Sequence, residues 1–114
     1  MDILLILKIV CAIATIGVGL VSLVAPRSIK GFTGLEATGP RGITEIRAVM
    51  GALFIGLGLA PFILAAPVVY QAIGITYLAI GLVRAVSMVL DRSIMQSNTI
   101  SLVVEIIFGV ILVL

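Results

Sequence analysis

The chain has 114 residues and a formal net charge of +2; 62% of its residues are hydrophobic, 11% are charged, and its mean hydropathy is +1.42. No soluble fold could cover so much apolar surface, so the composition predicts an integral membrane protein without room for a separate catalytic domain. Histidine, the commonest general base and metal ligand, is absent, and the single cysteine, Cys11, cannot form an internal disulfide. We therefore expect no metal and no cofactor.

Four segments reach the length of about 20 apolar residues that a hydrocarbon core of about 30 Å requires. They cover residues 3–24, 43–64, 67–90 and 93–114. The first ends before Pro26, because proline disfavours a helical conformation in the residue before it, and the third begins at Pro67, which suits a first helical turn. No segment alternates like a barrel strand. The prediction is an all-α fold in which residues 1–114 form a single membrane domain, a four-transmembrane-helix bundle.

Residues 25–42 form the one sizeable loop between the predicted spans, and two readings of it stay open. Ile29, Phe32 and Leu35 recur at three-residue intervals with basic residues between them, which is typical of a short helix lying in the headgroup region. The four glycines and two prolines of the loop equally favour an irregular conformation.

Basic residues near the span ends predict the orientation of the bundle. The side that holds the two loops carries Arg27, Lys30, Arg41, Arg47, Arg84 and Arg92, and the other side carries only Lys8. The predicted location is therefore the inner (plasma) membrane, with both loops cytoplasmic and both termini extracytoplasmic. Lipid headgroups account for these basic residues, so nucleic acid is not an expected partner.

Two charged residues, Arg84 and Glu105, lie inside predicted spans at similar depth, and a charge at membrane depth costs at least about 2.5 kcal/mol. Helical spacing adds neighbours on the same side of the membrane. The predicted polar pocket consists of Glu45, Arg47, Arg84, Ser87, Asp91 and Glu105. Arg84 and Glu105 can form a structural ion pair that fixes helix register, or a site for a substrate or a proton, and both readings stay open. No catalytic residues are predicted.

Small residues form a second pattern, along the second predicted span. Ala48, Ala52, Gly56 and Ala60 recur every four positions, with Gly51 and Gly58 beside them and Gly81 on the next span. Such a ridge allows close approach of two helix backbones, either within one chain or between two copies. We expect it to face another helix, so that Gly56→Leu would overfill a tight contact.

The stretch from Thr44 to Leu59, the stretch from Gly81 to Asp91 and the glutamate of the last span together resemble the bacterial domain-of-unknown-function 4345 family. The resemblance covers nearly the whole chain and implies a small four-helix membrane protein, more distantly similar to the DoxX-like group. The chain departs from the family pattern at Arg92, where a glycine usually follows the aspartate, so we expect the turn there to be built differently. The resemblance implies no particular activity.

Three functions are compatible with these features. The first is a non-enzymatic protein that self-associates or serves as an accessory subunit of a membrane complex, which the small-residue ridge and the lack of catalytic groups favour. The second is a small-solute or proton-coupled transporter with its pocket around Arg84 and Glu105. The third is an enzyme or lipid-binding module acting on a hydrophobic substrate at the cytoplasmic interface. In each of them the lipid bilayer is a partner.

Overall fold

A computed structural model describes residues 2–114, and within that range the chain is helical without strands. The elements are α1 (Ile3–Val24), η1 (Pro26–Ile29), α2 (Lys30–Thr33), α3 (Pro40–Glu45), η2 (Ile46–Ala52), α4 (Leu53–Leu64), α5 (Pro67–Leu90) and α6 (Gln96–Val113). α3, η2 and α4 run on as one segment, so that four helical segments are long and apolar enough to cross a membrane. The all-α class is thus confirmed.

The chain divides into two compact units, which are described separately. One comprises Ile9–Ala65, and we call it the first hairpin. The other comprises Ala66–Leu114 together with the start of the chain up to Lys8, and we call its α5–α6 part the second hairpin.

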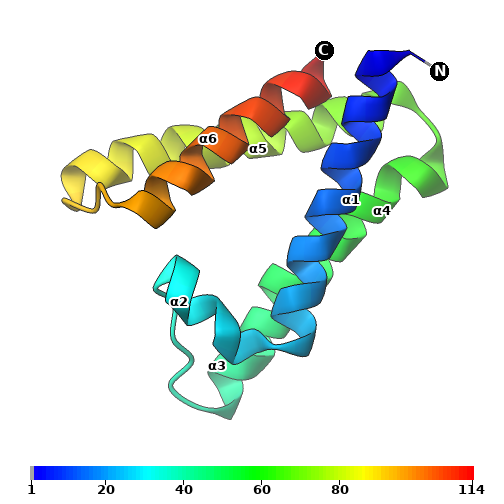
Figure 1. Ribbon diagram of the computed structural model, residues 1–114. Coiled ribbons are helices and arrows are strands. Elements are labelled where there is room, and N and C mark those ends of the chain that lie inside the picture. The colour runs from blue at the N-terminus through cyan, green and yellow to red at the C-terminus, as the bar shows by residue number, and fades with distance from the viewer. Residues whose placement is uncertain (1) are drawn as a thin grey trace. The chain divides into compact units, whose positions relative to one another are not determined.

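Glycines bring the two long segments of the first hairpin into backbone contact (Figure 1). A Cβ atom added to Gly58 would lie 2.6 Å from the carbonyl oxygen of Ala12, and one added to Gly19 would lie 2.6 Å from that of Gly51. Cβ atoms do not approach oxygens so closely, so these positions accept only glycine at the present helix separation. Small residues at helix contacts are the usual means of close packing in membranes.

The predicted ridge of small residues is not the surface that α1 contacts. Ala48, Ala52 and Gly56 are exposed, and a Cβ atom added to Gly56 would meet no atom within 4 Å. α1 packs instead against the neighbouring stripe, where Gly51 and Gly58 are buried two turns apart. The physical reason is that the α1 backbone lies directly against this stripe, with the Ala12 oxygen at Gly58 and the Leu23 backbone at Gly51, which leaves little room for a Cβ atom at either position. Ala60 is half-buried at the far end of the ridge.

The second span differs from its prediction at its start and in its interior. It begins at Pro40 and not at Ile43, because Pro40 occupies the first turn and an Arg41–Glu45 ion pair, one turn apart, supports the extra residues. Its middle, η2, is a π-helix, a wider turn that carries no simple sequence signal. Gly51 lies in this wide turn, where an added Cβ atom would come within 3.2 Å of the Leu23 backbone.

Between α1 and α3 the loop is helical at first and irregular afterwards, so each of the two readings describes part of it. η1 and α2 cover Pro26–Thr33, and Gly34 ends α2 in the left-handed conformation (φ 76°) that glycine adopts most readily. Of the three apolar residues, Ile29 is buried, whereas Phe32 and Leu35 are about half exposed.

In the second hairpin, α5 and α6 lie side by side (Figure 1), and glycines again bring the two helix backbones into contact. A Cβ atom on Gly74 would lie 2.9 Å from the Gly109 oxygen, and one on Gly109 would lie 3.2 Å from the Gly74 oxygen. Nearby, the Tyr77 and Phe108 rings meet edge to face with centroids 5.5 Å apart. The helices therefore touch through their backbones at the end that lies away from the connecting turn.

α6 begins at Gln96, three residues later than the predicted start near Ser93. The intervening residues close the turn: the Ser93 N–H donates to the Met88 oxygen at 3.0 Å, and Met95 is extended. α6 still has 18 residues, a length of roughly 27 Å at about 1.5 Å per residue. Arg92, which replaces the glycine expected there, has φ 52°, so the turn keeps the left-handed conformation that glycine would supply.

Candidate functional site

Arg84 on α5 and Glu105 on α6 form a two-point ion pair. Nε of Arg84 donates to Oε1 of Glu105 at 2.7 Å, and its second terminal nitrogen donates to Oε2 at 2.8 Å. The side chains are 31% and 11% exposed, respectively. Gly81, one turn before Arg84, is buried, and a Cβ atom there would come within 3.6 Å of the Glu105 Cβ. The antiparallel register of two consecutive spans thus pairs the two residues directly.

Asn98 completes the contact and was not among the predicted site residues. Its Oδ1 accepts a hydrogen bond from Arg84 at 2.9 Å, and its Nδ2 donates to the Ser93 oxygen at 2.9 Å. The amide therefore ties the guanidinium to the α5–α6 turn. The available signal was spacing, because Asn98 precedes Glu105 by seven residues and so lies on the same face of α6.

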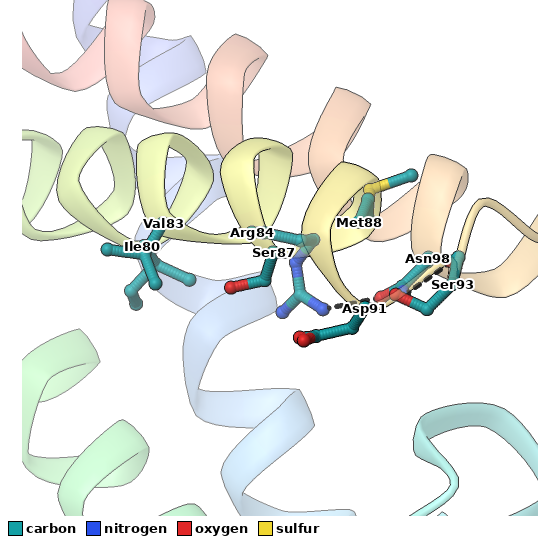
Figure 2. A pocket seen from close by; sticks show the side chains of 8 residues that line it. All are labelled: Ile80, Val83, Arg84, Ser87, Met88, Asp91, Ser93 and Asn98. Atoms are coloured by element: carbon teal, nitrogen blue, oxygen red, sulfur yellow. Dashed lines mark hydrogen bonds between the residues drawn. The ribbon is translucent and has the colours of Figure 1, made fainter.

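Beside this ion pair lies a hollow of about 340 Å³. Figure 2 shows Arg84, Ser87 and Asp91 on its α5 side and Ser93 and Asn98 at the turn, with Ile80, Val83 and Met88 completing the lining. For the Asp91 carboxylate the structure describes no hydrogen bond or ion pair with any of residues 2–114. Arg84 is neutralised by Glu105, and the unpaired Asp91 carboxylate is the other charge that lines the hollow; Arg92, the next residue, is not one of its lining residues.

The Arg84–Glu105 ion pair limits the chemistry that the side chains around the hollow can perform. Both oxygens of Glu105 accept hydrogen bonds from Arg84, so a proton transferred to Glu105 would weaken a charge-assisted pair. Within residues 2–114, no group of three or more His, Cys, Asp or Glu side chains could hold a metal ion. What the hollow offers is hydrogen bonding and charge.

The two remaining members of the predicted pocket make contacts within the first hairpin. Glu45 pairs with Arg41, one turn earlier. Arg47 donates from Nε to the Leu23 oxygen at 3.1 Å, satisfying a carbonyl that the end of α1 leaves without a helical partner. The structure thus joins Arg84, Ser87 and Asp91 around one hollow, with Glu105 paired to Arg84. That Glu45 and Arg47 share this pocket stays a prediction.

These observations define the class: an all-helical protein with four membrane-length apolar helices, two of them joined by an Arg–Glu ion pair. The family model for a domain of unknown function, DUF4345, matches residues 3–114, and the chain belongs to this family. Comparisons with curated proteins and with solved structures found no match.

Proposed function

We propose that the protein is a non-enzymatic integral membrane protein that acts through helix packing, as a homo-oligomer or as an accessory subunit of a larger membrane complex. Its four apolar helices suggest a protein that spans the membrane, and less than a third of each is buried within the chain. The observation that carries the proposal is the exposed ridge of Ala48, Ala52 and Gly56. It lies beside the stripe that α1 occupies and has open space above Gly56.

Such a ridge suits a helix from another chain. Without a hydrophobic driving force between helices in lipid, association depends on close van der Waals packing, which small residues permit. The Arg84–Glu105 ion pair agrees with this structural role, since it joins α5 to α6 through both oxygens of Glu105.

The test is purification in gentle detergent followed by mass determination of the intact particle. A dimer or higher oligomer, or a stoichiometric complex with an unrelated membrane protein, is the expected result. Gly56→Leu should reduce the particle to a folded monomer, because the larger side chain blocks the ridge without touching α1. Ile63→Leu, an exposed change on the same helix, serves as the control. A wild-type monomer, or a complex unaffected by Gly56→Leu, would overturn the proposal.

The second candidate function is transport of a small solute or a proton, and the hollow beside Arg84 favours it. Because the Asp91 carboxylate lines the hollow without a described partner, a cation is the solute class that the hollow suits best. Uptake of a cationic dye into vesicles containing the purified protein would support transport, provided that Asp91→Asn abolishes it and the loop substitution Glu36→Gln does not. Absence of uptake for monovalent cations, protons and cationic dyes would remove this candidate.

For the orientation, we propose that both loops face the cytoplasm and both termini face outward in the inner membrane. The support is the distribution of basic residues, of which six accompany the loops and one, Lys8, lies toward the other side.

A further inference from the structure

Two arginines of the first hairpin line a second hollow, of about 450 Å³, at the end of α1. Arg27 comes from η1 and Arg47 from η2. The other lining residues include Val24, Pro26, Ser28 and Ile43. This hollow shares no lining residue with the hollow beside Arg84, so it is a separate feature of the molecule.

The charge of this hollow is uncompensated. No acidic residue lines it. The other two basic side chains of the loop have carboxylate partners: Lys30 pairs with Glu36 at 3.1 Å, and Arg41 pairs with Glu45. Within residues 2–114, Arg27 and Arg47 have none. Two arginines without carboxylate partners therefore line one space, which is an arrangement suited to an anion.

The Arg47 side chain and the backbone that carries Arg27 are held in place. Arg47 is anchored through Nε to the Leu23 oxygen, which leaves the N–H groups on both terminal nitrogens available. Ser28 donates to the Ala25 oxygen at 2.7 Å and fixes the start of η1, and Pro26 is buried. A guanidinium presents paired N–H groups whose spacing matches the oxygens of a phosphate. The site can therefore receive a phosphate with two such groups.

The position of the hollow indicates which phosphate-containing molecule would bind there. The hollow lies where one apolar segment ends at Val24 and the next begins at Pro40, which is headgroup level for helices that span a bilayer. Its apolar members continue onto the faces of these segments, and Val24 is 76% exposed. We propose that this hollow binds the phosphate of an anionic phospholipid, with the acyl chains along the apolar faces. The inference rests on the membrane location alone and not on the accessory role.

The test is a lipid titration of the delipidated full chain in detergent, followed by native mass spectrometry to measure the Kd of the first bound lipid. Dioleoyl phosphatidylglycerol should bind more tightly than dioleoyl phosphatidylcholine. Arg27→Gln and Arg47→Gln should each weaken the phosphatidylglycerol complex by roughly fivefold, as expected for one basic residue at a membrane surface. Glutamine at position 47 can still donate to Leu23, and Arg27 makes no contact that folding requires, so at least one variant reports on a folded protein.

The control is Arg92→Gln, which removes the same charge from the α5–α6 turn and does not line the hollow. The Kd of this variant should change less than about twofold, as expected for loss of a charge that makes no contact with the bound phosphate. Equal losses in Arg92→Gln and Arg27→Gln, or no preference for phosphatidylglycerol, would show general surface attraction and overturn the proposal. In the last part of the test, glycerol phosphate is added as a soluble competitor of the lipid. If it displaces the lipid at equal concentration, the site is one for a soluble anion and the lipid assignment is wrong.

Discussion

Arg84 is held at three points, by both oxygens of Glu105 and by Asn98, and it belongs to a segment of membrane length. Removing either charge leaves the other without its counter-ion in a region of low dielectric. Breaking a fully buried pair costs about 3 to 5 kcal/mol, and since a third of the Arg84 side chain is exposed we expect about 2 to 4 kcal/mol for Arg84→Gln or Glu105→Gln. The double substitution should cost less than either single one.

A double-mutant cycle by reversible unfolding in mixed micelles measures this coupling. Asn98→Ala in the same cycle separates the contribution of the amide, which we expect to be about 1 kcal/mol. Simple additivity of Arg84→Gln and Glu105→Gln would mean that each charge is stabilised independently, by water or lipid, and that the contact between them contributes nothing.

Arg92 adopts a backbone conformation that side chains disfavour, with φ 52° in the turn between α5 and α6. Glycine has no such penalty, so Arg92→Gly should raise the free energy of unfolding by about 0.5 to 1 kcal/mol, the gain being limited by the greater freedom of glycine in the unfolded chain. Arg92→Ala removes the same charge but keeps the Cβ atom. An equal gain in both variants would assign the effect to the charge and not to the backbone.

Among helical elements, the decisive contacts are those of individual glycines. Gly58 and Gly56 lie two residues apart on α4, yet a Cβ atom on Gly58 would collide with the Ala12 backbone oxygen while one on Gly56 would meet nothing. Gly58→Ala should therefore destabilise the first hairpin by about 1 to 3 kcal/mol through overpacking. Gly56→Ala should be neutral, or stabilising by up to about 1 kcal/mol, because alanine favours the helix.

Thermal unfolding in detergent measures the stability of both variants, with Gly56→Ala as the matched control for Gly58→Ala. Equal stability of the two variants would mean that α1 and α4 move apart at little cost, and that close packing at Gly58 does not hold the hairpin together.

Sequence predicts elements well where length and proline determine them. α1 and α5 occupy the ranges that their apolar runs and Pro26 and Pro67 indicate. Sequence fails where the outcome depends on a partner surface. Two stripes of small residues lie side by side on the second span, and the backbone of α1 lies against the one that contains Gly51 and Gly58. The π-helix has equally little sequence signal, whereas the start at Pro40 has one in the proline itself, which suits a first helical turn.

The candidate site, too, has one feature that the sequence predicts and one that it does not. The pairing of Arg84 with Glu105 is accessible from sequence, because consecutive spans are antiparallel and the two residues match in depth. Asn98 is harder to find, since an asparagine near a helix start is ordinarily read as a capping residue. Its role becomes evident only when the turn places Ser93 and Arg84 on either side of the amide.

At the scale of the whole molecule, the two hairpins share one asymmetry of charge. In each of them the basic residues accompany the loop, and membrane insertion retains such loops in the cytoplasm. The anionic lipid site at Arg27 and Arg47 adds a further consequence. If the loops are cytoplasmic, that site faces the leaflet surface whose negative potential attracts basic segments, so orientation and lipid binding reinforce each other.

Thiol labelling in intact cells tests this orientation. Cys11 is buried and is first replaced by alanine, so that an introduced cysteine is the only thiol in the chain. Thr38→Cys places that thiol on the exposed part of the loop, and a cysteine added after Leu114 places it at the exposed C-terminus. Because the loop carries three basic residues and Arg47 follows it in η2, a membrane-impermeant maleimide should leave Thr38→Cys unlabelled until the cells are permeabilised, whereas the C-terminal cysteine should react at once. The reverse pattern would place the loops outside and remove the charge argument for the orientation, while equal labelling of both positions would indicate a chain inserted in two orientations.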